Sequence, residues 1–211
     1  RFENTEVRVI LSGSEEAGLR GAKAYAKAHK DELKDLVLFR SGAERKYVSL
    51  KEYTDAMREE QKYIYYASGE SRERIEMLPQ VEAMKGRGFE VLYLTDYIDE
   101  FALKVLEKYA DKEFKNVTAE TQDFSSEDEK AELEAANESF SDMLNAMREA
   151  IPNVSGVKFT NSLTKHPVCL SSEGELSVEM EKVLKKMRGA DGMTPSANVI
   201  MEINRTHTIA E

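Results

Sequence analysis

The sequence is 211 residues long, enough for one or two domains with apolar cores, and no apolar run approaches the roughly 20 residues that span a bilayer. Its formal net charge is −10, which argues against nucleic acids and anionic membranes as partners, because both are themselves negative. A single cysteine and the absence of a signal peptide favour a reducing, cytoplasmic location.

The order of periodic and polar stretches divides the chain into four segments. An alanine-rich helix is predicted over 15–29, and a second short stretch follows around Leu33–Phe39. We expect lead-in helices at 1–48, a small α/β unit at 49–118, a polar linker at 119–125 and an α+β domain at 126–211.

The α/β unit has a strand–helix–strand pattern. Tyr63–Ala67 and Phe89–Thr95 are short apolar runs, as expected of strands buried on both faces. Between them, Ser71 can cap one helix and Pro79 suits the first turn of the next. A crossover of this length predicts a parallel strand pair.

A further helix is predicted from about Tyr97 to Tyr109. We expect its buried face to carry the apolar residues that recur at helical spacing, which are Ile98, Phe101, Ala102 and Val105.

Two capping boxes mark helix starts, because in each a Ser oxygen and a Glu carboxylate satisfy each other's backbone donors. The first is Ser49 with Glu52, and the second is Ser126 with Glu129, which opens a helix predicted to run to about Ala150. Three strands with alternating apolar residues should follow, around Val157 and Phe159, around Val168 and Leu170, and around Val199, Met201 and Ile203.

The expected fold class is therefore α/β (α+β). A small α-β-α sandwich with a short parallel sheet precedes an α+β domain with a three-stranded sheet and long helices.

Cys169 lies three residues after His166, so a thiol active site has to be weighed. A nucleophilic thiol needs a base and an electropositive setting. In an extended strand, however, residues three apart point to opposite faces. We interpret Cys169 as a buried structural cysteine.

The loop 68–71 joins a predicted strand to a helix start, where backbone amides could hold a phosphate. It lacks both a Walker lysine pattern and a G-x-G-x-x-G run, so a plain connection is favoured. Asp96, Asp99 and Glu100 could suit a hard metal, yet acidic residues at a helix start need none. We predict neither catalytic nor metal-binding residues.

The helix predicted over about 176–187 has one apolar stripe, formed by Leu176, Met180, Val183, Leu184 and Met187. A stripe of this kind usually packs in a core. Methionine is also common on surfaces that bind many partners. The pattern alone favours core packing, but the two methionines, the Gly-rich segment that follows and the family resemblance given below together lead us to hypothesise a largely exposed apolar face.

Several stretches resemble the heat shock protein 90 chaperone family, and look most like its bacterial, high-temperature protein G (HtpG) type. They are "YVSLKEYTDAMREEQKYIYYASGES", "FEVLYLTDYIDEFALKVL", "DKEFKNV" and "HPVCLSSEGELSVEMEKVL" with "VIMEIN". The resemblance covers about residues 29–118 and 126–204 in the correct order. It implies the end of a middle domain followed by most of a C-terminal domain.

The resemblance also implies a function: as part of a molecular chaperone, this fragment would contact unfolded client proteins and couple them to the ATP-driven cycle of the full-length dimer. ATP and Mg²⁺ would be held by an N-terminal domain outside this chain, so no cofactor is expected here and this fragment would not be an enzyme. The partners would be unfolded or partly folded clients and an Hsp70-type chaperone. The full-length protein would be a homodimer and this fragment mainly monomeric. The implied client-binding residues are Ile98, Glu100, Phe101, Leu176, Met180, Val183, Leu184 and Met187.

Two rival readings remain. One is an α/β enzyme, or a phosphate- or nucleotide-binding domain, that uses the loop 68–71. The other is a scaffold module acting through its acidic helix, whose binding would weaken with salt.

Overall fold

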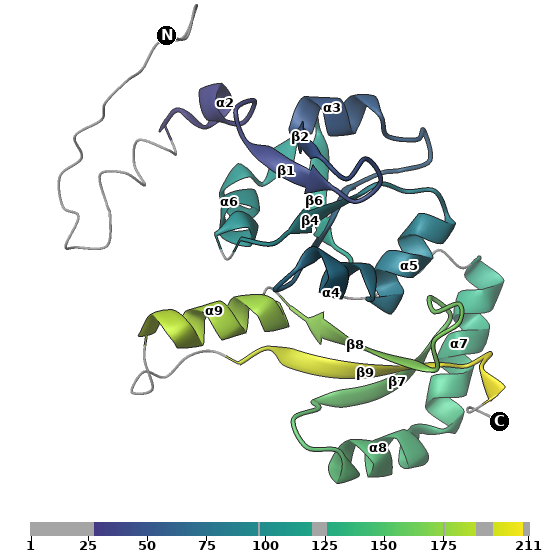
Figure 1. Ribbon diagram of the computed structural model, residues 1–211. Coiled ribbons are helices and arrows are strands. Elements are labelled where there is room, and N and C mark those ends of the chain that lie inside the picture. The colour runs from purple at the N-terminus through teal and green to yellow at the C-terminus, as the bar shows by residue number, and fades with distance from the viewer. Residues whose placement is uncertain (1–27, 97, 120–125, 175, 189–195, 209–211) are drawn as a thin grey trace, which may run out of the picture. The chain divides into compact units, whose positions relative to one another are not determined.

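The computed structural model describes residues 28–96, 98–119, 126–174, 176–188 and 196–208 (Figure 1). The chain divides into two compact units, Arg1–Val37 and Leu38–Glu211. The described part of the first unit contains the short helix α2 (Lys30–Leu33). The helix predicted over 15–29 lies almost entirely outside the described residues.

The larger sheet of the second unit has the strand order β2-β1-β4-β3-β6-β5. Strand β3 is parallel to β4 and to β6, which confirms the predicted parallel pair, whereas β1 is antiparallel to β2 and to β4. The segment 1–48 thus supplies strand residues where we expected helices. The strands are β1 (Leu38–Ser41), β2 (Tyr47–Ser49), β3 (Ile64–Ser68), β4 (Val91–Leu94), β5 (Lys108–Tyr109) and β6 (Lys112–Asn116).

The helices that connect these strands begin where the sequence predicts. Ser49 and Glu52 form the expected capping box, and the Ser71 hydroxyl accepts a hydrogen bond from the Arg74 amide. Pro79 occupies the first turn of its helix. The helices are α3 (Leu50–Asp55), α4 (Arg72–Glu76), α5 (Pro79–Gly86) and α6 (Asp99–Leu106).

The core of the larger sheet is built from the two apolar runs. The first four residues of β3 and all of β4 are buried, as expected of central strands covered on both faces. Tyr53 brings a polar group into this core, and its hydroxyl donates to the Glu90 carbonyl at 2.6 Å. The same oxygen accepts from Gln61 Nε2 at 2.8 Å and from the Tyr65 amide at 3.1 Å, so burial leaves it satisfied.

Helix α6 buries a different face from the one predicted. Glu100, Leu103 and Leu106 are buried, whereas Ile98 and Val105 are 57% and 53% exposed. The prediction from apolar spacing was wrong about which face is buried, because the buried face includes the carboxylate residue Glu100.

The smaller sheet has the order β7-β9-β8, with β7 parallel and β8 antiparallel to β9, which confirms the predicted three-stranded sheet. Its strands are β7 (Gly156–Thr160), β8 (Val168–Glu173) and β9 (Asn198–Asn204), and α9 (Val178–Arg188) connects β8 to β9.

The long helix predicted from Ser126 to Ala150 is two helices, α7 (Glu127–Ser139) and α8 (Ser141–Ala150). Its capping box at Ser126 and Glu129 is confirmed. The break is at Phe140, and both helices pack against β7. A single helix of that length would extend about 36 Å, far beyond the five-residue strand β7. The break lets both helices contact this short strand.

Helices α7 and α8 cover only part of the smaller sheet. The strand register places Val168 and Leu170 on the face that also carries Phe159 and Ile203. Phe159 and Ile203 are buried because they lie under the helices, whereas Val168 and Leu170 on β8 remain 41% and 55% exposed. The predicted strand is therefore correct, but its apolar side chains are not half-buried.

Polar contacts join the two sheets. The Ser172 amide donates to the Thr118 carbonyl at 3.0 Å, and Gln80 Nε2 donates to the Leu170 carbonyl at 2.9 Å. Glu82 on α5 pairs with Lys165 at 2.8 Å and contacts His166 at 3.0 Å. His166 therefore faces a carboxylate of α5. Of the predicted linker at 119–125, Ala119 alone lies within the described residues.

Candidate functional site

The residues that the resemblance assigns to client contact lie on α6, on α9 and just before α9. Ile98, the N-cap residue of α6, is exposed, and Phe101 on α6 is half-buried. Glu100 is only 5% exposed. Glu100 therefore differs from its two neighbours, because its side chain is turned into the protein.

The carboxylate of Glu100 accepts hydrogen bonds from three elements. Oε2 accepts from Ser68 Oγ at 3.0 Å and from Ser177 Oγ at 2.9 Å. Oε1 accepts from Asn116 Nδ2 at 3.3 Å. Burial and the neighbouring Glu100 carboxylate together raise the pKa of Tyr66. A buried carboxylate needs such donors, because an unsatisfied one is costly.

Helix α9 is held at its start and near its middle. The Ser177 hydroxyl accepts from the Met180 amide at 3.1 Å and so caps the helix. Glu181 accepts from the Ala197 amide at 2.8 Å and also pairs with Lys185. The lysine and these hydrogen bonds hold the pKa of Glu181 below its ordinary value.

The apolar stripe of α9 is less exposed than we hypothesised. Met180 is only 5% exposed, so the expectation of an exposed face is wrong for this residue. Leu176, Val183 and Leu184 are half-buried. Met187 belongs to α9, but its side chain lies outside the described residues. Part of the stripe, including Met180 and Val183, lies across a cavity from the carboxyl ends of β3 and β4.

A cavity of about 330 Å³ remains between α9 and these strand ends. Met180 and Val183 line it from α9, and Ser68, Gly69 and Asp96 line it from the larger sheet. In open α/β sheets this edge is the usual place for a ligand. Here α9 occupies it.

The loop 68–71 is poorly suited to a phosphate. A Cβ at Gly69 would lie 2.8 Å from Ile75 Cγ1, so the loop closes tightly on its own helix. The helix that follows, α4, has only five residues. The cavity above the loop carries four carboxylate side chains and two lysines: Glu70, Asp96, Glu100, Glu179, Lys182 and Lys186. Like charges would repel a phosphate there.

Asp96 and Asp99 have a structural explanation. Asp99 Oδ2 accepts from the Asp96 amide at 3.3 Å, and partial burial raises the pKa of Asp99. Within the described ranges, no three His, Cys, Asp or Glu residues are grouped as a metal site would require. In the same ranges, no helix is long and apolar enough to cross a membrane.

A second cavity, of about 630 Å³, lies on another side of Glu100. Tyr63, Tyr66 and Phe114 supply aromatic walls, and charged side chains of both signs surround them. Lys115 Nζ lies 4.8 Å from the centroid of the Tyr63 ring, which favours a cation–π contact. Glu100 thus lines two cavities.

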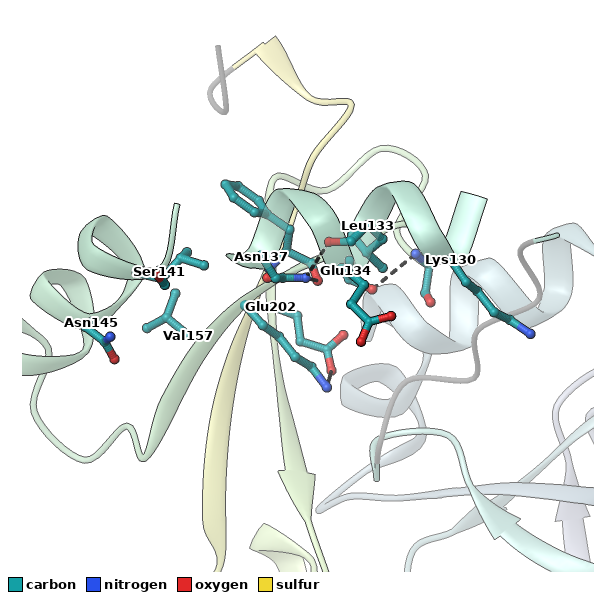
Figure 2. A pocket seen from close by; sticks show the side chains of 13 residues that line it. Lys130, Leu133, Glu134, Asn137, Ser141, Asn145, Val157 and Glu202 are labelled. Atoms are coloured by element: carbon teal, nitrogen blue, oxygen red, sulfur yellow. Dashed lines mark hydrogen bonds and ion pairs between the residues drawn. The ribbon is translucent and has the colours of Figure 1, made fainter. Parts of the chain in front are cut away.

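A third cavity, of about 520 Å³, lies between α7, α8 and the smaller sheet (Figure 2). Asn137 Oδ1 accepts from the Phe159 amide at 2.8 Å, which fixes α7 to β7. Glu202 on β9 is fully buried, accepts from Ser171 Oγ at 2.7 Å and lies 3.6 Å from Lys158 Nζ. Sequence reasoning missed Asn137 and Glu202. The sequence offered one sign of the buried Glu202, which is a charged residue between the apolar residues Met201 and Ile203 of a predicted strand.

Cys169 is buried beside Glu202, its partner in the β8–β9 register. Burial, and then the Glu202 charge, raise the pKa of its thiol to about 12. A thiol with such a pKa stays protonated and is a poor nucleophile. The interpretation of Cys169 as structural agrees with this environment.

The family model and the similar curated proteins point to the same family. The family model described as "Hsp90 protein" matches residues 19–211. A curated "Chaperone protein HtpG" of Clostridium perfringens is 47% identical over 182 residues, which are 86% of this chain and 28% of that protein. A "Chaperone protein HtpG" of Alkaliphilus oremlandii is 48% identical over 187 residues, covering 87% of this chain and 29% of that protein. The chain therefore spans less than a third of the length of these relatives.

A solved structure is also similar, the middle domain of a Plasmodium falciparum heat shock protein. It has 34% sequence identity, covers 46% of this chain and 41% of that chain, and gives a TM-score of 0.42.

Proposed function

Because this chain belongs to the Hsp90 protein family, we propose that it serves a molecular chaperone by contacting unfolded or partly folded client proteins. In this proposal it couples the bound client to an ATP-driven cycle of the full-length protein. The observation that carries the proposal is the exposed apolar side of α6, which presents Ile98 and Val105. Apolar burial is non-directional, so such a surface suits partners of many shapes.

We assign different roles to the residues that the resemblance implies. Ile98 and Phe101 are accessible enough to touch a client, and so are the half-buried Leu176, Val183 and Leu184. Glu100 and Met180 would act by holding α6 and α9 in place, because both are buried. Met187 remains a proposed contact through its place on α9.

We propose that this chain neither binds nor hydrolyses ATP, and that ATP and Mg²⁺ are held elsewhere in the full-length protein. The tight turn at Gly69 and the carboxylates above the loop 68–71 support this. Calorimetric titration with Mg²⁺–ATP should give no binding heat at micromolar concentrations. Micromolar affinity with phosphate release would instead favour the nucleotide-binding alternative.

The remaining partners belong to the same proposal. A full-length homodimer and cooperation with an Hsp70-type chaperone rest on the family resemblance. A cytoplasmic location is part of the proposal and is supported by the single cysteine, and the net charge of −10 argues against nucleic acids and anionic membranes as partners.

The client proposal is tested by substituting Ile98→Ser on α6. Burying an isoleucine side chain in a complex contributes about 1.5–3 kcal/mol, so affinity for an unfolded protein should fall by about tenfold or more. The measurement is binding to reduced, carboxymethylated α-lactalbumin by fluorescence anisotropy.

Leu36→Ser is the matched control, because Leu36 is 72% exposed and lies in the other compact unit. Equal effects of the two substitutions would mean that any exposed apolar residue serves, and the assignment to α6 would be lost.

A further inference from the structure

Glu100 is a buried carboxylate that shares a side-chain hydrogen bond with Tyr66 on β3 and accepts from three further neutral side chains. They come from the end of β3 (Ser68), the end of β6 (Asn116) and the residue before α9 (Ser177). These donors are 32, 16 and 77 residues away from Glu100 in the sequence, so the carboxylate joins distant segments of the chain. We call this group of contacts the junction. The junction is therefore held by several side-chain hydrogen bonds that share one buried acceptor group.

The contact with Ser177 has a particular consequence for α9. A hydroxyl has one proton to donate and lone pairs with which to accept. Ser177 donates that proton to Glu100 and accepts from the Met180 amide, which lies in the first turn of α9. The carboxylate therefore orients the oxygen that caps the helix. Its negative charge next to a helix N-terminus is also favourable.

The same glutamate is a residue of α6. Its neighbours on that helix, Ile98 and Phe101, are the accessible apolar residues of the proposed client surface. A displacement of α6 by a bound partner therefore shifts the acceptor on which the cap of α9 depends. The second fastening of α9, from Glu181 to Ala197, involves no residue of α6.

We infer that Glu100 is a positioning residue that couples α6 to the first turn of α9, so that occupation of the α6 surface changes how firmly α9 is held. Its functional consequence rests on the proposed client binding, whereas the coupling itself does not. Substitution of Glu100 would then weaken client binding even though the side chain is too deeply buried to touch a client.

Hydrogen exchange on the whole 211-residue chain tests the coupling. The readout is the exchange rate of the Met180 and Glu181 amides divided by that of the Val91 amide in β4, which separates local opening from global unfolding. In Glu100→Gln one acceptor oxygen becomes a donor amide. This ratio should rise about five- to tenfold, the size expected when a helix cap is lost. Glu113→Gln, an exposed carboxylate on the same cavity, should leave it unchanged.

Substitutions of Ser177 test the same contact from the α9 side, and they serve if Glu100→Gln does not fold. Ser177→Ala should raise the ratio as Glu100→Gln does, and Ser177→Thr, which keeps the hydroxyl, should restore it. The double substitution Glu100→Gln with Ser177→Ala should exceed Ser177→Ala alone by less than about twofold, because both remove one contact. Fully additive effects, or an equal rise at all amides, would overturn the coupling.

The client arm uses reduced, carboxymethylated α-lactalbumin as the unfolded probe. Bound probe should change the Met180 ratio in the unsubstituted chain and leave it constant in Glu100→Gln. If the probe binds and the ratio stays constant in both, the coupling is wrong. If the probe does not bind at all, the proposed function fails, and the exchange ratios of the free variants still decide the coupling.

Discussion

The two sheets of the second unit are stabilised by different means. The core of the larger sheet is a continuous apolar cluster that includes Tyr65, Ile75, Val91 and Tyr93. Among the described residues, the apolar cluster between the smaller sheet and its two helices is smaller, and its buried members are Leu144, Phe159 and Ile203. Many other buried positions of the smaller sheet are polar, among them Ser171, Glu202 and Asn204.

This difference has an energetic meaning. Apolar burial scales with area and tolerates changes of shape that preserve volume. Buried polar groups are neutral to stability only while every partner is present, and each lost partner leaves a costly unsatisfied group. The larger sheet should therefore respond to loss of volume, and the smaller sheet to loss of a single hydrogen bond.

The largest expected effect is a cavity in the larger sheet. Leu92 on β4 is fully buried, so Leu92→Ala should lower the free energy of unfolding by about 2–5 kcal/mol. Urea denaturation followed by circular dichroism measures this. Leu38→Ala is the control, since Leu38 is 57% exposed and its substitution should cost no more than about 0.5 kcal/mol. A loss at Leu92 as small as that at Leu38 would contradict the comparison.

The next effect concerns the buried carboxylate of the smaller sheet. Glu202→Ala leaves Ser171 Oγ without its acceptor, and should cost about 1–3 kcal/mol. The same urea experiment applies, with Glu134→Ala as the matched control, because Glu134 lines the same cavity and is exposed. If both glutamates can be removed at equal cost, the smaller sheet does not depend on its polar contacts.

The smallest effect is a pH dependence at the junction of α9 and β9. The pKa of Glu181 in the folded chain lies below its ordinary value of 4.5, chiefly because of Lys185 and the Ala197 amide. The carboxylate therefore stabilises the fold fully above that ordinary value, and its contribution is lost as pH falls through the folded pKa.

The Ala197 amide should consequently lose protection from hydrogen exchange, relative to Ile200, as the pH falls below 4.5 and through the lower pKa of Glu181 in the folded chain. Glu181→Gln should remove this pH dependence. A pH profile that persists in the substituted chain would assign it to another group.

Much of this architecture could be predicted from local sequence. Both capping boxes and the Pro79 helix start depend on residues within one turn of each other, and all are confirmed. The continuous apolar runs gave β3 and β4 for a similar reason, since each run alone excludes a solvated face.

The candidate site could be predicted only in part, because its burial depends on distant donors. Glu100 lies inside α6 because Ser68, Asn116 and Ser177 reach it. No periodicity rule places a carboxylate at an inward position, so apolar spacing predicted a different buried face for α6. The exposure of Met180 was misjudged for a related reason, since the strand ends that bury it lie more than 80 residues away in sequence.

Cys169 has an experimental use that follows from its surroundings. It is the sole thiol of the chain, lies 6% exposed beneath the β8–β9 pairing, and has a pKa of about 12. Burial and the raised pKa of the thiol therefore both slow its reaction with an alkylating reagent in the folded chain. The alkylation rate of Cys169 therefore measures how often local opening exposes this part of the smaller sheet, and no engineered cysteine is needed for the experiment.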